Sequence, residues 1–238
     1  MAGEKLVVGY WAIRGLGAPL RMMCVYAGVD YDPALYEVTE KEGGGWDVSS
    51  WFSKKPALKE RNALMNLPYV VDGDNVVTQS NACMLYLGRK LKLVGKNDAD
   101  LIKVEQTLCE VFDLRNNAVK LFYSSPDDFE KGREGFLEKT VKTSYGKLNG
   151  WLEQQGTVYL AGDEPTAPDF HFFELIDQIE SLAKKYNKDS PMKEFTAVTK
   201  LYESFKSIPA IQKYLESDLH KLPINNKMAS FGAVPEDS

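Results

Sequence analysis

Residues 9–21 read GYWAIRGLGAPLR, and this stretch decides how the first part of the chain folds. Residues 5–10 (KLVVGY) lead into it as an apolar run of strand length. Residues 18–28 (APLRMMCVYAG) follow it, with a proline near the first turn of a predicted helix and a glycine at its end. The stretch therefore predicts a strand, a glycine-bearing loop and a helix. Tyr10 ends the strand, at a place where chains often meet ligands.

The next seventy residues extend this pattern. Residues 34–38 (ALYEV) alternate like a second strand, and residues 66–90 contain two strands joined by a turn at DGDN, followed by a helix that Ser80 is expected to cap. Residues 39–65 hold three consecutive glycines and two tryptophans without clear periodicity. We expect them to be irregular, with one short helix near residues 50–54. The predicted order is β-α-β, a connection, then β-β-α.

The character of the sequence changes after a polar link near residues 91–98. Residues 101–123 have the periodicity of a long bundle helix, and Thr166 with Asp169 forms a capping box ahead of an apolar run. The sequence therefore predicts an α/β domain over residues 1–90 and an all-helical domain over residues 98–238.

Composition excludes several classes of function. Among 238 residues the net charge is −5 and no basic stripe occurs, which argues against a nucleic-acid partner. No apolar run is long enough for a membrane span and no secretory signal is evident, so we expect a cytoplasmic protein. Three scattered cysteines, expected to be small buried side chains, and two histidines leave little material for a metal site, and none is predicted. His171 is expected to be structural.

Two features of the first domain favour a small anionic peptide as ligand. The helix that starts near Ser80 offers free backbone N–H groups, and Gln79 adds side-chain donors. Pro68 stands just before a strand, where a cis bond is common, so the backbone of Leu67 can pair with a peptide-like ligand. In the second domain Asp113 interrupts an apolar helix face. We expect it to be half-buried and to meet a ligand or a second subunit, because Arg115 is two positions away and points elsewhere.

Several spaced motifs occur in one order: GYWAIRGLGAPLR, NLPYVVDG (66–73), TQSNA (78–82), the Thr166–Asp169 box and LPINNKMASFG (222–232). Over nearly its whole length the chain resembles the mu class of cytosolic glutathione transferases. The resemblance implies a thioredoxin-like first domain, an all-helical second domain and a homodimer. Glutathione would be a co-substrate, with no cofactor, and would be conjugated to small hydrophobic electrophiles.

The resemblance also implies roles for individual residues. Tyr10 would be the catalytic phenol that activates the thiol as thiolate, and Tyr123 a second tyrosine assisting the transition state. Glutathione would be bound by Tyr10, Trp11, Trp51, Lys55, Asn66, Leu67, Gln79, Ser80 and, reaching from the partner subunit, Asp113. The electrophile pocket would contain Ile13, Leu16, Asn116, Tyr123 and Asn226.

Some positions depart from the family pattern. Val48 stands where the family has an arginine, and the stretch between Lys55 and Asn66 is two residues longer than usual, so that Arg61 could replace the missing charge. Leu64 takes the place of the aromatic residue that docks into the partner subunit. Two alternatives therefore stay open: a non-catalytic carrier of hydrophobic ligands that retains the glutathione site, and a glutathione-dependent isomerase.

Overall fold

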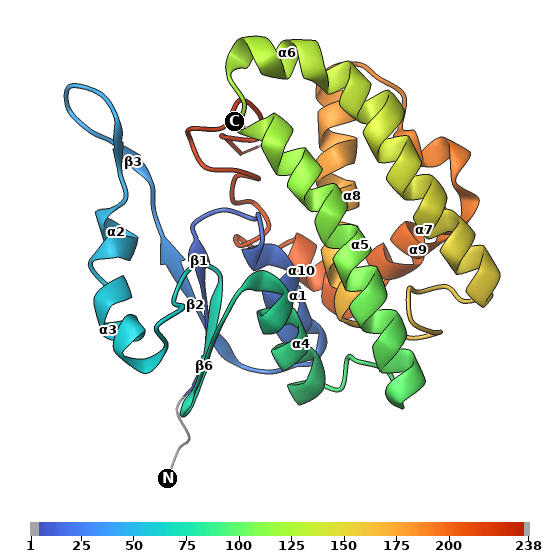
Figure 1. Ribbon diagram of the computed structural model, residues 1–238, viewed down its shortest axis with the longest axis horizontal. Helices are drawn as coiled ribbons and strands as arrows, with labels where there is room; N and C mark the ends of the chain where they lie inside the picture. Colours follow the sequence, from blue (N-terminus) through green and yellow to red (C-terminus); the bar gives the residue numbers. More distant parts are fainter. Residues whose placement is uncertain (1–4, 236–238) are drawn as a thin grey trace.

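The computed structural model describes residues 5–235, which form two parts lying side by side (Figure 1). The outer limits of the two expected domains, residues 1–4 and 236–238, lie outside the described residues. The strands are β1 Leu6–Trp11, β2 Tyr31–Tyr36, β3 Thr39–Glu40, β4 Trp46–Asp47, β5 Tyr69–Asp72 and β6 Asn75–Thr78. The helices are α1 Gly17–Tyr26, α2 Ser49–Phe52, α3 Lys55–Arg61, α4 Ser80–Lys90, α5 Asp98–Phe122, α6 Pro126–Gly135, the π-helix η1 Phe136–Val141, α7 Lys142–Gln155, α8 Ala167–Lys185, the 3-10 helix η2 Pro191–Glu194, α9 Thr196–Lys206 and α10 Pro209–Leu215.

The four longer strands form a mixed sheet in the order β2-β1-β5-β6. β1 runs parallel to β2, with α1 as the crossover helix, and antiparallel to β5. Gly9 of β1 lies opposite Tyr69, and a Cβ at Gly9 would come within 2.1 Å of the Tyr69 ring. The sheet thus confirms the expected α/β first half, and the named elements that follow it, up to residue 235, are all helices.

The segment 39–65 is more ordered than its sequence predicts. It contains a short β3–β4 hairpin whose tip, Gly43–Gly45, has positive φ throughout, and the two helices α2 and α3. In Figure 1 the hairpin projects away from the body of the molecule. The short helix expected near residues 50–54 corresponds to α2, whereas α3 was not expected. α3 buries none of its residues, so it leaves no apolar periodicity in the sequence.

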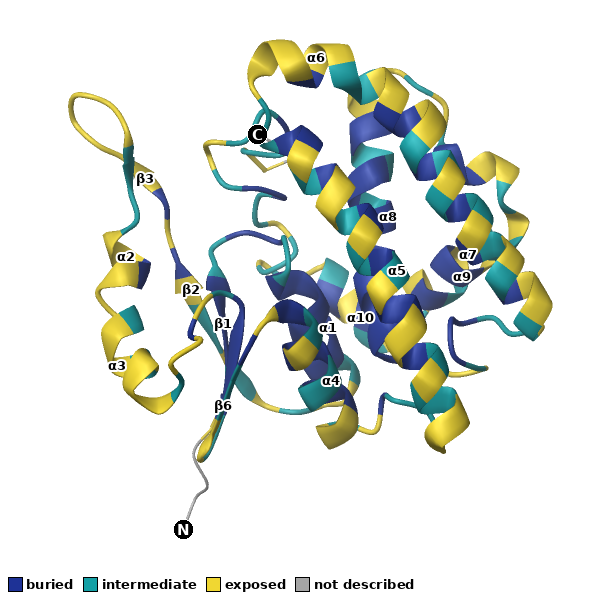
Figure 2. Ribbon diagram, in the orientation of Figure 1, coloured by how far each residue is buried: buried dark blue, intermediate teal, exposed yellow. Residues whose placement is uncertain are grey.

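Helix α8 is the centre of the second part and is buried on nearly all sides (Figure 2). It begins at the predicted capping box, which the structure confirms. Both the backbone N–H and the hydroxyl of Thr166 donate to Asp169 Oδ2, each at 2.8 Å. Burial raises the pKa of the Asp169 carboxyl to about 6. The box fixes the start of the helix that carries Glu174 and Asp177 toward the first part of the chain.

The C-terminal tail ties the two parts together at the loop between β1 and α1. The backbone N–H groups of Arg14 and Gly15 donate to the carbonyl oxygens of Pro223 and Ile224, at 2.8 and 3.1 Å. Helices α8 and α10 also pack against α1. The loop is therefore held from both sides. None of the helices within residues 5–235 is long and apolar enough to cross a membrane.

Candidate active site

Tyr10 lies at the end of β1 and is 6% exposed. Two glycines of the loop leave room for its ring. A Cβ at Gly15, where φ is +36°, would lie 2.8 Å from the ring and 3.1 Å from the hydroxyl oxygen. A Cβ at Gly17, the first residue of α1, would lie 2.9 Å from the neighbouring atom on the same edge of the ring. The glycines of the motif thus serve the position of the phenol as well as the turn.

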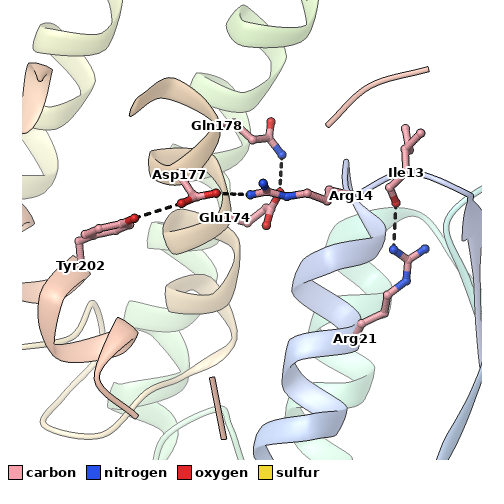
Figure 3. A network of polar contacts seen from close by, with 7 residues as sticks. All are labelled: Ile13, Arg14, Arg21, Glu174, Asp177, Gln178 and Tyr202. Carbon is pink, nitrogen blue, oxygen red and sulfur yellow. Dashed lines mark hydrogen bonds and ion pairs between the residues drawn. The ribbon is translucent and has the colours of Figure 1, made fainter. Parts of the chain in front are cut away.

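Two arginines of the same motif, for which the sequence suggested no role, hold the loop in place. Arg21 of α1 is fully buried, and its guanidinium donates to the carbonyl oxygens of Ile13 at 2.9 Å and Trp11 at 3.2 Å. Arg14 reaches across to α8, where its Nε donates to Glu174 Oε1 at 2.9 Å and its Nη2 pairs with Asp177 (Figure 3). The loop that follows Tyr10 is therefore anchored in both parts of the chain.

Further bonds complete this cluster, which consists of Arg14, Glu174, Asp177, Gln178 and Tyr202. Gln178 donates to Glu174 Oε1 at 2.7 Å, and the Tyr202 hydroxyl donates to Asp177 at 3.1 Å (Figure 3). Burial raises the pKa of Glu174 although Arg14 opposes it. Burial also opposes ionisation of Asp177, but Arg14 outweighs it and the pKa is lowered. The two carboxyls therefore differ in how readily they bind a proton.

A small cavity of about 20 Å³ lies beside Tyr10. Its wall includes Tyr10, Tyr123 and Ile13, together with Gly15, Arg115, Val119, His171, Glu174, Leu175, Gln178 and Asn225. The Tyr123 hydroxyl oxygen accepts a hydrogen bond from the backbone N–H of Asn226 at 3.0 Å, which leaves the hydroxyl proton for another acceptor. Burial is the main reason that the pKa of Tyr123 is raised, so the phenol stays protonated at neutral pH.

A second cavity, of about 220 Å³, lies between the ends of β1 and β2 and the C-terminal tail. Ile13 lines both cavities, and Asn226 lines the larger one. Of the five residues expected around an electrophile, the structure thus brings Ile13, Tyr123 and Asn226 together. Leu16 and Asn116 line neither cavity.

The residues expected to hold the glycine end of glutathione lie beyond the edge of the sheet. Trp51 is 1% exposed because it packs between Tyr36 and Tyr69, with ring centroids 5.1 and 5.9 Å away. Lys55 Nζ lies 5.8 Å from the Trp51 ring centroid. Arg61, considered above as a replacement charge, instead donates to the carbonyl of Gly73.

The backbone around Leu67 is fixed by one side chain. The Leu67–Pro68 bond is cis, as expected. The Thr78 hydroxyl donates to the carbonyl of Asn66 at 2.7 Å and accepts from its N–H at 3.1 Å. Thr78 closes this turn, a role that was not predicted from the sequence.

The start of α4 corrects one expectation. Ser80 is the first residue of the helix and not its cap, which is Gln79. Gln79 is exposed and has φ 72° and ψ 122°, a conformation that costs a non-glycine residue of the order of 1–3 kcal/mol. Such strain is concentrated at functional sites. The strained turn presents the Gln79 side chain and the N-terminus of α4 at the same edge as Asn66.

Two residues of α5 are more exposed than expected. Cys109 and Asp113 are both exposed, because the buried stripe of α5 runs through Val104, Leu108 and Val111. Asp113 lines a groove of about 640 Å³ between α5 and α7 and lies in neither cavity near Tyr10. Leu64, the expected subunit anchor, is 72% exposed.

Comparison with known proteins matches both parts of the chain. The family model for the glutathione S-transferase N-terminal domain covers residues 6–89, and the model for the C-terminal domain covers residues 112–218. Glutathione S-transferase Mu 3 of Macaca fuscata fuscata is 33% identical over 98% of this chain and 97% of the relative. The chain belongs to the glutathione S-transferase family. This transferase is also 33% identical to Glutathione S-transferase Mu 3 of Homo sapiens and 30% identical to a glutathione S-transferase of Tyrophagus putrescentiae.

The resemblance of the transferase to the mu class is thereby confirmed. Two solved structures share its fold: the glutathione S-transferase Blo t 8, with a TM-score of 0.80 at 24% identity over 95% of this chain, and the Pi-class enzyme of Onchocerca volvulus, with a TM-score of 0.77 at 21% identity over 94%. Each match covers 99% of the solved chain. Within residues 5–235 of the transferase, no group of three His, Cys, Asp or Glu side chains is arranged to hold a metal ion.

Proposed function

We propose that this transferase activates the thiol of glutathione through the hydroxyl of Tyr10 and conjugates it to small hydrophobic electrophiles. The observation that carries the proposal is the position of Tyr10. It stands at the end of β1, where two glycines leave room for one edge of its ring, at the meeting point of the two parts of the chain and beside Tyr123.

One hydrogen bond from Tyr10 is sufficient for the activation. A free thiol, with a pKa near 8.5, is only a few per cent ionised at neutral pH, and the thiolate is the nucleophile. Lowering the thiol pKa by about 2 units requires about 2.7 kcal/mol of preferential stabilisation of the anion. A charge-assisted hydrogen bond in a partly dry site supplies about 1.5–3 kcal/mol.

The remaining site residues would bind the two substrates. Lys55 and Trp51 would hold the glycine end of glutathione, and the backbone of Asn66 and Leu67 the cysteinyl part. The γ-glutamyl carboxylate would lie against Gln79 and Ser80 at the start of α4. The electrophile would lie between the parts of the chain, against Ile13, Leu16, Asn116, Tyr123 and Asn226. The free proton of Tyr123, whose oxygen is held by Asn226, would assist the transition state.

We also propose an oligomeric state, a division into domains and a cellular location for this transferase. The active form would be a homodimer in which Leu64 docks into the partner and Asp113 reaches its glutathione. The exposure of both residues in the single chain supports this arrangement. Residues 1–90 would form the glutathione-binding domain and residues 98–238 most of the electrophile pocket. The enzyme would work in the cytoplasm and need no cofactor.

The absorbance of enzyme-bound thiolate, followed against pH in the wild type and in Tyr10→Phe, tests the proposal. We expect the wild type to form thiolate well below the pKa of the free thiol and Tyr10→Phe to need a pH about 2 units higher. Turnover with a reactive aryl halide should fall in parallel. If bound glutathione titrates as in water in both proteins, Tyr10 is not the activating donor and a carrier function replaces the proposal.

A further inference from the structure

The ion cluster at the junction contains more negative than positive charge. Arg14 and Glu174 have side chains that are 3% and 2% exposed, and that of Asp177 is 22% exposed. Two ionised carboxylates beside one guanidinium leave one surplus negative charge in a region nearly closed to water. His220 does not compensate it, because burial lowers the pKa of His220 to about 4 and the imidazole is neutral at pH 7.

The same cluster reaches the cavity beside Tyr10 through Glu174. Its Oε1 accepts hydrogen bonds from Arg14 and Gln178. Its Oε2 is buried and has no hydrogen-bond partner among residues 5–235. His171 Nδ1 is likewise buried and has no hydrogen-bond partner among residues 5–235. Both Glu174 and His171 line the cavity. A buried polar atom without a hydrogen-bond partner lowers stability, so the site favours a polar occupant.

The cavity has the size and the partners for one water molecule. Its volume of about 20 Å³ exceeds what one water centre requires. A water donating to Glu174 Oε2 and to His171 Nδ1 would satisfy both unpaired atoms. Its oxygen would remain free to accept a hydrogen bond from Tyr10, which lines the same cavity.

Several other titratable groups lie near Glu174, whose own pKa is governed by burial, Arg14, Asp177 and Gln178. Tyr10 of β1, Tyr123 of α5 and Tyr214 of α10 are phenols, and burial raises the pKa values of Tyr123 and Tyr214. Burial, with a smaller effect of Arg115, lowers the pKa of His171 to about 3, so this imidazole is neutral. Arg115 of α5 is half-exposed, and its guanidinium donates a hydrogen bond to Asn116 Oδ1. Of the two carboxyls, Glu174 is the more readily protonated.

We propose that one water molecule in this cavity connects the Tyr10 hydroxyl with Glu174 Oε2, and that Glu174 takes up the proton that the glutathione thiol loses. The inference rests on the proposed role of Tyr10. The S–H bond breaks as its proton passes to the Tyr10 oxygen. Tyr10 gives its own proton to the water, and the water gives one to Glu174. The net change is an S–H bond replaced by a carboxyl O–H bond, and the renewed Tyr10 hydroxyl donates to the thiolate.

Charge balance is the physical reason for this transfer. A thiolate formed beside the cluster adds a second negative charge to the surplus already there, and like charges in a poorly hydrated site repel strongly. Protonation of Glu174 leaves Arg14 paired with Asp177 alone, so the cluster becomes neutral as the thiolate forms. The total charge of the buried region is unchanged.

The test counts protons released when glutathione binds. Calorimetric titrations at pH 7 in two buffers of different ionisation enthalpy give the number of protons, and binding of S-methylglutathione, which has no thiol proton, gives the baseline. Thiolate absorbance is read on the same samples. We expect the wild type to release well under half a proton per thiolate formed and Glu174→Gln to release about one. Tyr202→Phe, which loses a hydrogen bond of the cluster but no charge, should match the wild type.

Release of one proton per thiolate by the wild type would overturn the inference and leave the role of Tyr10 intact. So would equal release by the wild type and Glu174→Gln. Absence of thiolate in the wild type would refute the proposed function and the inference with it. If Glu174→Gln does not fold, the inference is tested by the infrared difference spectrum between wild-type protein with and without glutathione. A new carboxylic-acid carbonyl band must appear on binding glutathione, and its absence rejects Glu174 as the acceptor.

Discussion

Replacing His171 by phenylalanine should make the fold less sensitive to acid. His171 is 3% exposed, its Nδ1 has no partner among the described residues, and its ring lies 6.4 Å from that of Phe112. Phenylalanine has a ring of similar size and suits this apolar contact, but the cavity water proposed above would lose Nδ1 as an acceptor. At pH 7 the free energy of unfolding should therefore stay within about 1 kcal/mol of the wild type.

The magnitude at lower pH follows from the depressed pKa of His171. Burial lowers it from 6.5 to about 3, so between these values the unfolded chain binds a proton that the folded chain does not. The free energy of unfolding then falls as the pH falls, by about 1.4 kcal/mol per pH unit. At pH 4.5 the loss attributable to His171 is about 2.7 kcal/mol, and at pH 7 it is only about 0.2 kcal/mol.

Urea unfolding of the wild type and His171→Phe at pH 7.0, 5.5 and 4.5 measures this difference. His220 and all carboxyls are common to both proteins, so the difference between the two curves isolates His171. We expect the curves to diverge by about 1.4 kcal/mol at pH 5.5 and about 2.7 kcal/mol at pH 4.5. If the free energies of unfolding of the two proteins keep a constant difference over this pH range, His171 has the same pKa in the folded and the unfolded chain. That result would contradict the lowered pKa expected from its burial.

Three further predictions concern the junction, the loop and the subunit contact. Arg14→Met should lower the free energy of unfolding by about 3–5 kcal/mol in urea, because it leaves Glu174 buried without its cation, and a loss below about 1 kcal/mol would contradict the role given to the cluster. Gly15→Ala should reduce kcat/KM by about tenfold or more, since its Cβ meets the Tyr10 ring at 2.8 Å. The control Gly135→Ala, with no atom within 4 Å of its added Cβ, should keep wild-type activity. Leu64→Asp should shift the chain from dimer to monomer in sedimentation experiments, and an unchanged dimer would exclude Leu64 as the anchor.

Local patterns were enough to predict much of the fold. β1, α1 and the β5–β6 hairpin each follow from a periodicity and a turn within a few residues, and the Thr166 box marks the start of α8. Failures arose where position depends on the rest of the chain. Ser80 suits a cap by type, but the strained Gln79 takes that position. No propensity scale predicts such a conformation, because surrounding structure has to impose it.

From the sequence, only those candidate site residues that lie within recognisable motifs could be predicted. Tyr10 and its neighbours lie in one stretch, and the family resemblance supplies their roles. Arg14 lies in that stretch too, yet its partners are 160 and 163 positions away. One sequence carries no signal that pairs residues at such a distance, so the cluster and the cavity behind Tyr10 became visible only in three dimensions.

The ion cluster limits how freely the two halves of this transferase can be exchanged with those of its relatives. Arg14 stands four positions after Tyr10, and its guanidinium enters the helical half of the protein, where it pairs with α8. Any other helical half joined to this sheet would therefore have to accommodate a buried guanidinium at the same place. A hybrid enzyme whose helical half lacks carboxyl groups at the places of Glu174 and Asp177 would inherit a buried, uncompensated cation four residues after Tyr10. Recombination between such enzymes is therefore constrained by three side chains, and a designer of hybrids has to transfer them as one unit.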